Sequence, residues 1–193
     1  GGAHNLYVDE IQGHLYTCGA HGSLGLLNGS YIFDIRNFPA TLKLAGVYTP
    51  NPSPLRTRFA VHDIVTQSYT RAEQIDLLGV PNENATELLV IAVSSNEQTF
   101  DLVNVTDVSD AATLQNFRVR EGGAYYHQAW FTSDKHFIVL NDEDRPRIRR
   151  FLSANTIAKL HWIPNQGLRL IEVQQLRAPW PTNMHNVYVH SNR

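Results

Sequence analysis

The sequence predicts an all-β fold, and two observations lead to this prediction. Short stretches rich in β-branched and aromatic residues alternate with Asp, Asn, Gly, Pro and Ser along the whole chain of 193 residues. No segment sustains the i, i+3, i+4, i+7 apolar spacing of an amphipathic helix over three turns. Because 42% of the residues are hydrophobic and 18% are charged, the chain can bury the core of an ordinary folded domain.

A histidine followed by a carboxamide or carboxylate residue recurs four times. The histidines are 58 residues apart (from 4 to 62), 65 apart (from 62 to 127) and 58 apart (from 127 to 185). Each pair opens an alternating apolar stretch, and the four stretches read HNLYV, HDIVT, HQAWF and HNVYV. We therefore treat 1–193 as one region that contains the repeats 4–61, 62–126, 127–184 and a truncated repeat, 185–193.

Each full repeat contains four strand-like segments. The first strands are predicted near 4–9, 61–66, 126–132 and 185–190. The later segments read HLYTCGA, SYIFDIRN and ATLKLAGVY, then ELLVIAVSSNE, TFDLVNVTD and ATLQNFRV, then HFIVLNDE, IAKLHWIPN and LRLIEVQQL. A four-stranded antiparallel unit repeated at a fixed period is typical of a β-propeller blade, so the predicted fold is a propeller of which this chain forms about three and a fraction blades. The insert over 49–58 is predicted to be an irregular loop because its three prolines cannot donate to a ladder.

These repeats resemble those of the choice-of-anchor B family, whose propellers are described by LVIVD repeats. The resemblance rests on GAHNLYVDEIQGHLYTCGA, SNEQTFDLVNVTDVSDAATL, YHQAWFTSDKHFIVLNDE and MHNVYVHSNR, which follow the family's order. It implies about six blades in the ring, of which this chain would supply the central ones. The sequence departs from the family's pattern at Asn104, where a VDVTD-like stretch is usual, and in the insert over 49–58.

The repeated histidines are expected to meet at one mouth of the propeller channel. The first strand of a blade is innermost, and the antiparallel second strand returns to the same mouth. Three acids follow second strands and should therefore join the histidines. The residues expected at this mouth are His4, His62, His127, His185, Glu97, Asp142 and Glu143.

Two interpretations of this cluster remain open. Each neutral imidazole has one donor and one acceptor, so the histidines could lock each blade to its neighbour. Alternatively, imidazoles and carboxylates that converge on an axis suit a divalent transition metal such as Zn, Cu, Fe or Mn. The second members of the dipeptides would then be second-shell or opposite-facing groups, namely Asn5, Asp63, Gln128 and Asn186.

Composition excludes several classes of protein. With a formal net charge of −2, the chain lacks the excess of basic residues that is expected of a nucleic-acid binder. The basic run over 145–150 directly follows three acidic residues. No stretch is long and apolar enough to predict a transmembrane segment. The single cysteine, Cys18, cannot form an intrachain disulfide and is expected to be a small buried hydrophobe.

Three glycosylation sequons, at Asn28, Asn84 and Asn104, favour a eukaryotic secretory pathway and an extracellular or cell-surface location. No set of catalytic residues is evident. The expected function is therefore a binding or structural module, and the alternative is a metal-dependent enzyme, oxidase-like or hydrolase-like, with its site at the histidine mouth. The exposed blade edges are expected to be covered by the remainder of the propeller or by another copy of the chain, which could give a homo-oligomer or a filament.

Overall fold

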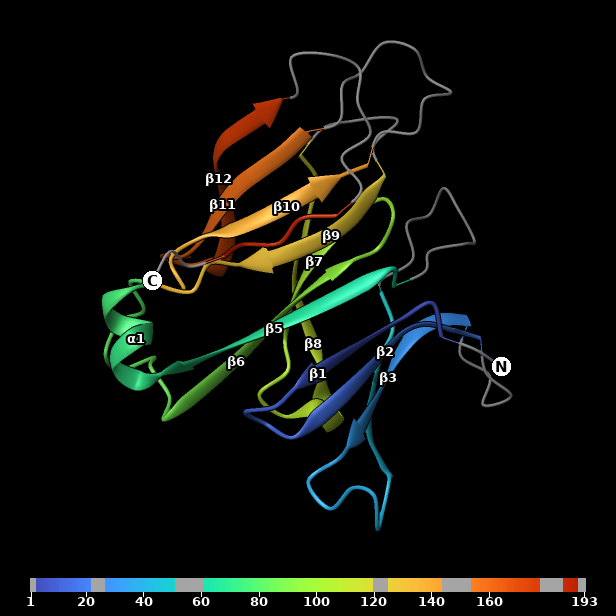
Figure 1. The fold of residues 1–193 in the computed structure, drawn as a ribbon. Helices are drawn as coiled ribbons and strands as arrows, with labels where there is room; N and C mark the ends of the chain where they lie inside the picture. Colours follow the sequence, from blue (N-terminus) through green and yellow to red (C-terminus); the bar gives the residue numbers. More distant parts are fainter. Residues whose placement is uncertain are drawn as a thin grey trace.

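The computed structural model describes residues 3–21, 27–50, 61–119, 125–143, 154–177 and 186–190. These residues form three separate four-stranded antiparallel sheets, in which consecutive strands are neighbours (Figure 1). The all-β prediction of propeller blades is confirmed. The blades are β1 to β4, β5 to β8 and β9 to β12, which we number 1, 2 and 3.

The strands of each blade follow one another along the chain. Blade 1 contains β1 (Asn5–Asp9), β2 (His14–His21), β3 (Leu27–Asp34) and β4 (Lys43–Tyr48). Blade 2 contains β5 (Asp63–Thr70), β6 (Leu88–Ser95), β7 (Phe100–Asn104) and β8 (Ala112–Phe117), with the 3-10 turn η1 (Val108–Asp110) before β8. Blade 3 contains β9 (Tyr126–Phe131), β10 (Ile138–Asp142), β11 (Ala154–Ile163) and β12 (Gly167–Arg177).

The predicted first strands correspond to β1, β5 and β9, which lie beside one another in the order of the blades (Figure 1). Residues 186–190, where a fourth first strand was expected, are not assigned to a strand. Most of the predicted irregular loop over 49–58 lies outside the described residues. Within the described residues, no helix has the length and hydropathy that crossing a membrane requires.

Two apolar layers hold the three blades together, one on each face of blade 2. Strand β6 shows the principle, because successive side chains of a strand point to opposite faces. Val90 and Ala92 pack into the layer shared with blade 1, whereas Ile91 and Val93 pack into the layer shared with blade 3. A strand that is covered on both faces needs a continuous apolar run, which explains the sequence LLVIAV in β6.

One short helix, α1 (Arg71–Asp76), follows β5, although the sequence analysis predicted no helix. Thr70 caps it: the Thr70 side chain accepts from the Glu73 amide, and the Glu73 carboxylate accepts from the Thr70 amide at 2.8 Å. This capping box satisfies two backbone donors that a helix start otherwise leaves without partners. The prediction failed because six residues are too few to show a helical period.

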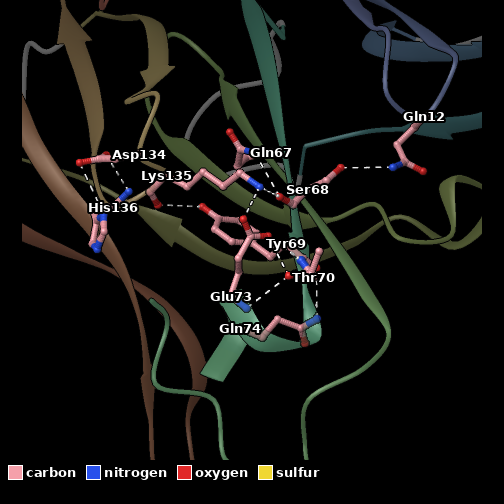
Figure 2. Close-up of polar contacts among 10 residues, drawn as sticks. All are labelled: Gln12, Gln67, Ser68, Tyr69, Thr70, Glu73, Gln74, Asp134, Lys135 and His136. Atoms are coloured by element: carbon pink, nitrogen blue, oxygen red, sulfur yellow. Dashed lines mark hydrogen bonds and ion pairs between the residues drawn. The ribbon is translucent and has the colours of Figure 1, made fainter. Parts of the chain in front are cut away.

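The helix also fastens blade 2 to blade 3 (Figure 2). Lys135 comes from the turn between β9 and β10, and its Nζ lies 2.7 Å from Glu73 Oε1 and 3.0 Å from the carbonyl oxygen of Ser68. The ammonium group also lies 5.9 Å from the centre of the Tyr69 ring. This contact lies at the Thr70 end of β5. The repeated histidine, His62, precedes the other end of the strand, which starts at Asp63.

Candidate functional site

Three of the four repeated histidines form a row at the starts of the inner strands. The ring centres of His4 and His62 are 4.2 Å apart, and those of His62 and His127 are 4.1 Å apart. The row therefore crosses all three blades. His4 is exposed, whereas His62 and His127 are only 8% and 5% exposed. The fourth histidine, His185, lies outside the described residues.

The row contains a direct hydrogen bond between blades. Nδ1 of His62 lies 3.0 Å from the backbone carbonyl oxygen of His127. Because a carbonyl can only accept, Nδ1 of His62 must carry the proton and donate it. The imidazole of blade 2 thus bonds to the inner strand of blade 3, as the latch interpretation expects.

His127 occupies a slightly different place from the other histidines. His4 and His62 precede their strands, but His127 is the second residue of β9. The strand starts at Tyr126 because this residue pairs with Asp142 of β10 across a β-bulge. Tyr126 also forms an isolated bridge with Glu97 of blade 2, through backbone hydrogen bonds of 3.0 and 3.1 Å. Glu97 adopts a positive φ of 60° to make this bridge.

The three predicted acids do converge on this end of the sheets, where they surround Tyr125. The Tyr125 hydroxyl donates to Glu97 Oε1 at 3.2 Å, and the Tyr125 amide donates to Asp142 Oδ1 at 3.0 Å. The Glu143 amide donates to the Tyr125 carbonyl at 2.9 Å, and Glu143 Oε2 lies 3.5 Å from Nε2 of His127. Tyr125 was missed by the sequence analysis because it precedes the repeated dipeptide and has no counterpart in the other repeats.

A second polar row, formed by the residues after the histidines, runs alongside the first. Asp63 accepts a hydrogen bond from the Ile64 amide at 2.8 Å, and the side chains of Gln128 and Asn5 lie close enough to its carboxylate to favour the charged form. Oε1 of Gln128 accepts from the amide of Val187 at 2.8 Å. The dipeptide therefore supplies two rows of contacts between blades, one of imidazoles and one of amides that meet at a single carboxylate.

Burial raises the pKa of two groups near the rows. Burial raises the pKa of Asp63 to about 6, although the hydrogen bonds from Ile64, Gln128 and Asn5 and the proximity of His4 act in the opposite direction. Burial also raises the pKa of the Cys18 thiol well above its usual range, with Asp63 contributing. Cys18 is fully buried, as the sequence predicts.

The described residues do not by themselves fit a metal centre. Nitrogen ligands bind zinc at about 2.0–2.1 Å, so several ring nitrogens must point at one position. In the described part of the chain, no group of three or more His, Cys, Asp or Glu side chains is arranged in this way. Because His185 is not among the described residues, a metal site that includes it stays a prediction.

The predicted glycosylation sites differ in their surroundings. Asn84 is exposed in the turn between α1 and β6. Asn104 is the half-buried last residue of β7, and its Oδ1 accepts from the Thr106 amide at 3.0 Å. Asn28 lies in β3, and its side chain is outside what the structure describes.

Among solved structures, the chain is similar to the crystal structure of a protein from Lactobacillus plantarum. The similarity has a TM-score of 0.53 at 15% sequence identity, and it covers 89% of this chain but 41% of the larger one. At this identity the similarity concerns the fold alone, and it supports a partial propeller. No protein-family model matches the chain, and no curated protein matches it.

Proposed function

We propose that this chain is part of a secreted or cell-surface β-propeller of the choice-of-anchor B kind, and that it acts as a binding or structural module. The observation that carries the proposal is the hydrogen bond from His62 Nδ1 to the carbonyl of His127. It gives the repeated histidine a structural task, which is to hold adjacent inner strands in register. The sequons at Asn28, Asn84 and Asn104 support the extracellular location.

The burial of the two histidines supports the latch. Both His62 and His127 are more than nine-tenths buried, so the hydrogen bond from His62 to the carbonyl of His127 is shielded from competition with water. The ring centres of adjacent histidines are 4.2 and 4.1 Å apart, so the rings also contact one another.

The substitution His62→Ala tests this role. It removes the donor and leaves the buried carbonyl of His127 without that bond, so we expect the free energy of unfolding to fall by about 1–3 kcal/mol. Urea unfolding followed by circular dichroism measures this loss. His190→Ala removes an exposed histidine outside both rows and serves as the matched control, with a change within about 0.5 kcal/mol.

The same experiment separates the latch from the metal-dependent enzyme. A latch predicts that a chelator such as EDTA leaves the stability of the unsubstituted protein unchanged. A metal centre that includes His185 predicts that EDTA lowers this stability and has no further effect on the His62→Ala variant. The second pattern would refute the structural role and favour the enzyme.

A further inference from the structure

The fourth, outermost strand of each blade carries one extra residue. Among the described pairings, that of the third strand with the fourth is the one that shifts by a residue in every blade. The residues without a partner in the third strand are Ala45 in β4, Leu114 in β8 and Val173 in β12. At such a β-bulge, two residues of one strand lie opposite one residue of its neighbour. Its recurrence in three sheets indicates that the bulge has a task in the outer strand.

The outer strands form the perimeter of the blades. Each of β4, β8 and β12 stands last in the order of its sheet, so one side of each has no neighbouring strand in the described part of the chain. This is equally true of β8, although blade 2 is packed between the other two blades. The free side therefore belongs to the architecture of a blade and does not depend on which blades are adjacent. Unpaired N–H and C=O groups on such an edge can pair with a strand of another molecule.

The bulges divide these edges into short regular runs. In β4 and β8, the longest regular runs are 46–48 and 115–117. In β12, which is the longest described strand with 11 residues, the bulge separates 167–172 from 174–177. A bulge also bends its strand and increases the local twist, so a straight partner strand cannot pair with both runs at once.

The edge of β12 has the greatest need of this interruption. Besides its length, it carries two exposed apolar side chains, because Val173 is 52% exposed and Leu176 is 43% exposed. Long, regular and apolar edges are the ones that lead to association between sheets.

We propose that the bulge in each outer strand protects the perimeter of this protein against edge-to-edge pairing with a second copy of the chain. The inference goes beyond the proposed binding or structural function and does not depend on the histidine latch. It is carried by the recurrence of the bulge on the one strand of each sheet that has a free side. Bulges and short edge strands are two of the means by which natural sheets avoid such pairing.

Deletion of Val173 would remove the bulge of β12 and leave the rest of its sheet in register. Glu172 pairs with Ala158 and Gln174 pairs with Ile157, and these two partners are consecutive residues of β11. Because paired residues share a face, Glu172 and Gln174 already point to opposite faces and can follow one another in a regular strand. Every other residue of β12 keeps its partner, and the edge becomes uninterrupted.

Light scattering and sedimentation velocity of the 193-residue chain and its variants, at equal concentrations, test the proposal. The matched control, Val173→Ala, keeps the bulge and removes most of the exposed side chain. We expect deletion of Val173 to raise the weight-average mass about two-fold or more above that of the control, because an uninterrupted edge can pair with another. Adding Leu176→Lys to the deletion should lower the mass again, since a lysine on an edge strand hinders pairing.

Deletion of Ala45 is the second variant, in case the first fails to fold. Leu44 and Gly46 pair with consecutive residues of β3, so this deletion also keeps the remaining register. It should raise the mass in the same way, and far-UV circular dichroism shows whether each variant is folded.

Three outcomes would overturn the proposal. A folded deletion variant with the mass of the control would show that the bulge does not prevent association. A Val173→Ala control that associates as strongly as the deletion would assign the protection to the side chain. Failure of both deletion variants to fold would mean that the bulges serve the packing of the blades, to which the hydrogen bond from Arg169 Nη1 to the Leu114 carbonyl at 3.0 Å belongs.

Discussion

The buried carboxylate of Asp63 should make the stability of this protein depend on pH. Its pKa is raised from 3.8 to about 6 in the folded chain because its side chain is only 8% exposed. Between these two values the folded state holds a proton that the unfolded state has released. The free energy of unfolding must therefore fall as pH rises through the window from about 4 to about 6.

The size of the effect follows from the two pKa values. One pKa unit corresponds to about 1.4 kcal/mol, so the shift corresponds to roughly 3 kcal/mol between pH 4 and pH 7. Asp63→Asn removes the titration while it keeps an oxygen for the Ile64 amide. The second carboxylate oxygen is lost, which adds a cost that does not depend on the ionisation of residue 63.

The assay is urea unfolding of the unsubstituted protein and of Asp63→Asn at half-unit steps from pH 4 to pH 8. The difference between the two free energies of unfolding should change by roughly 3 kcal/mol across the window, in favour of the variant at high pH. Glu10→Gln, which changes an exposed acid, should run parallel to the unsubstituted protein. A difference between Asp63→Asn and the unsubstituted protein that stays constant with pH would refute the reasoning.

Three further predictions concern the contacts between blades and the surface. A Cβ at residue 46 would overlap the carbonyl of Val108 in the next blade, so Gly46→Ala should lower the free energy of unfolding by about 1–3 kcal/mol in urea titrations. Tyr48→Phe removes a 2.6 Å hydrogen bond to the fully buried Asp101, and we expect a loss of about 1–3 kcal/mol by the same measurement, with no change in far-UV circular dichroism. Expression through a eukaryotic secretory pathway should add glycan at the exposed Asn84, and glycosidase treatment should then lower the intact mass, whereas an unchanged mass would contradict secretion.

The repeat made the fold and most of the histidine row predictable. A fixed period of the same dipeptide before an alternating strand predicts that equivalent residues lie at equivalent places, and three histidines do lie within ring contact. The orientation of the rings was not predictable, because the acceptor of His62 is a backbone carbonyl that any residue could supply. The early start of β9 depends on the pairing of Tyr126 with Asp142 across a β-bulge, which no local pattern specifies.

The second polar row and helix α1 illustrate two different reasons why prediction from the sequence was incomplete. The amides of Asn5 and Gln128 were noted as partners of the histidines, but their convergence on Asp63 depends on how closely the blades approach. The capping box of Thr70 and Glu73 was readable as T-x-x-E in the sequence. It was overlooked because the search for helices required three turns of apolar spacing, and α1 has fewer than two.

The continuous apolar run of β6 has a consequence for how the chain folds. Val90 and Ala92 need blade 1, and Ile91 and Val93 need blade 3, so blade 2 cannot shield its central strands until both neighbours are present. Folding should therefore be cooperative across the three blades instead of proceeding blade by blade. A chain interrupted after β8 would expose a short, uncharged, β-prone segment, LLVIAV, which is the kind of sequence that nucleates aggregation.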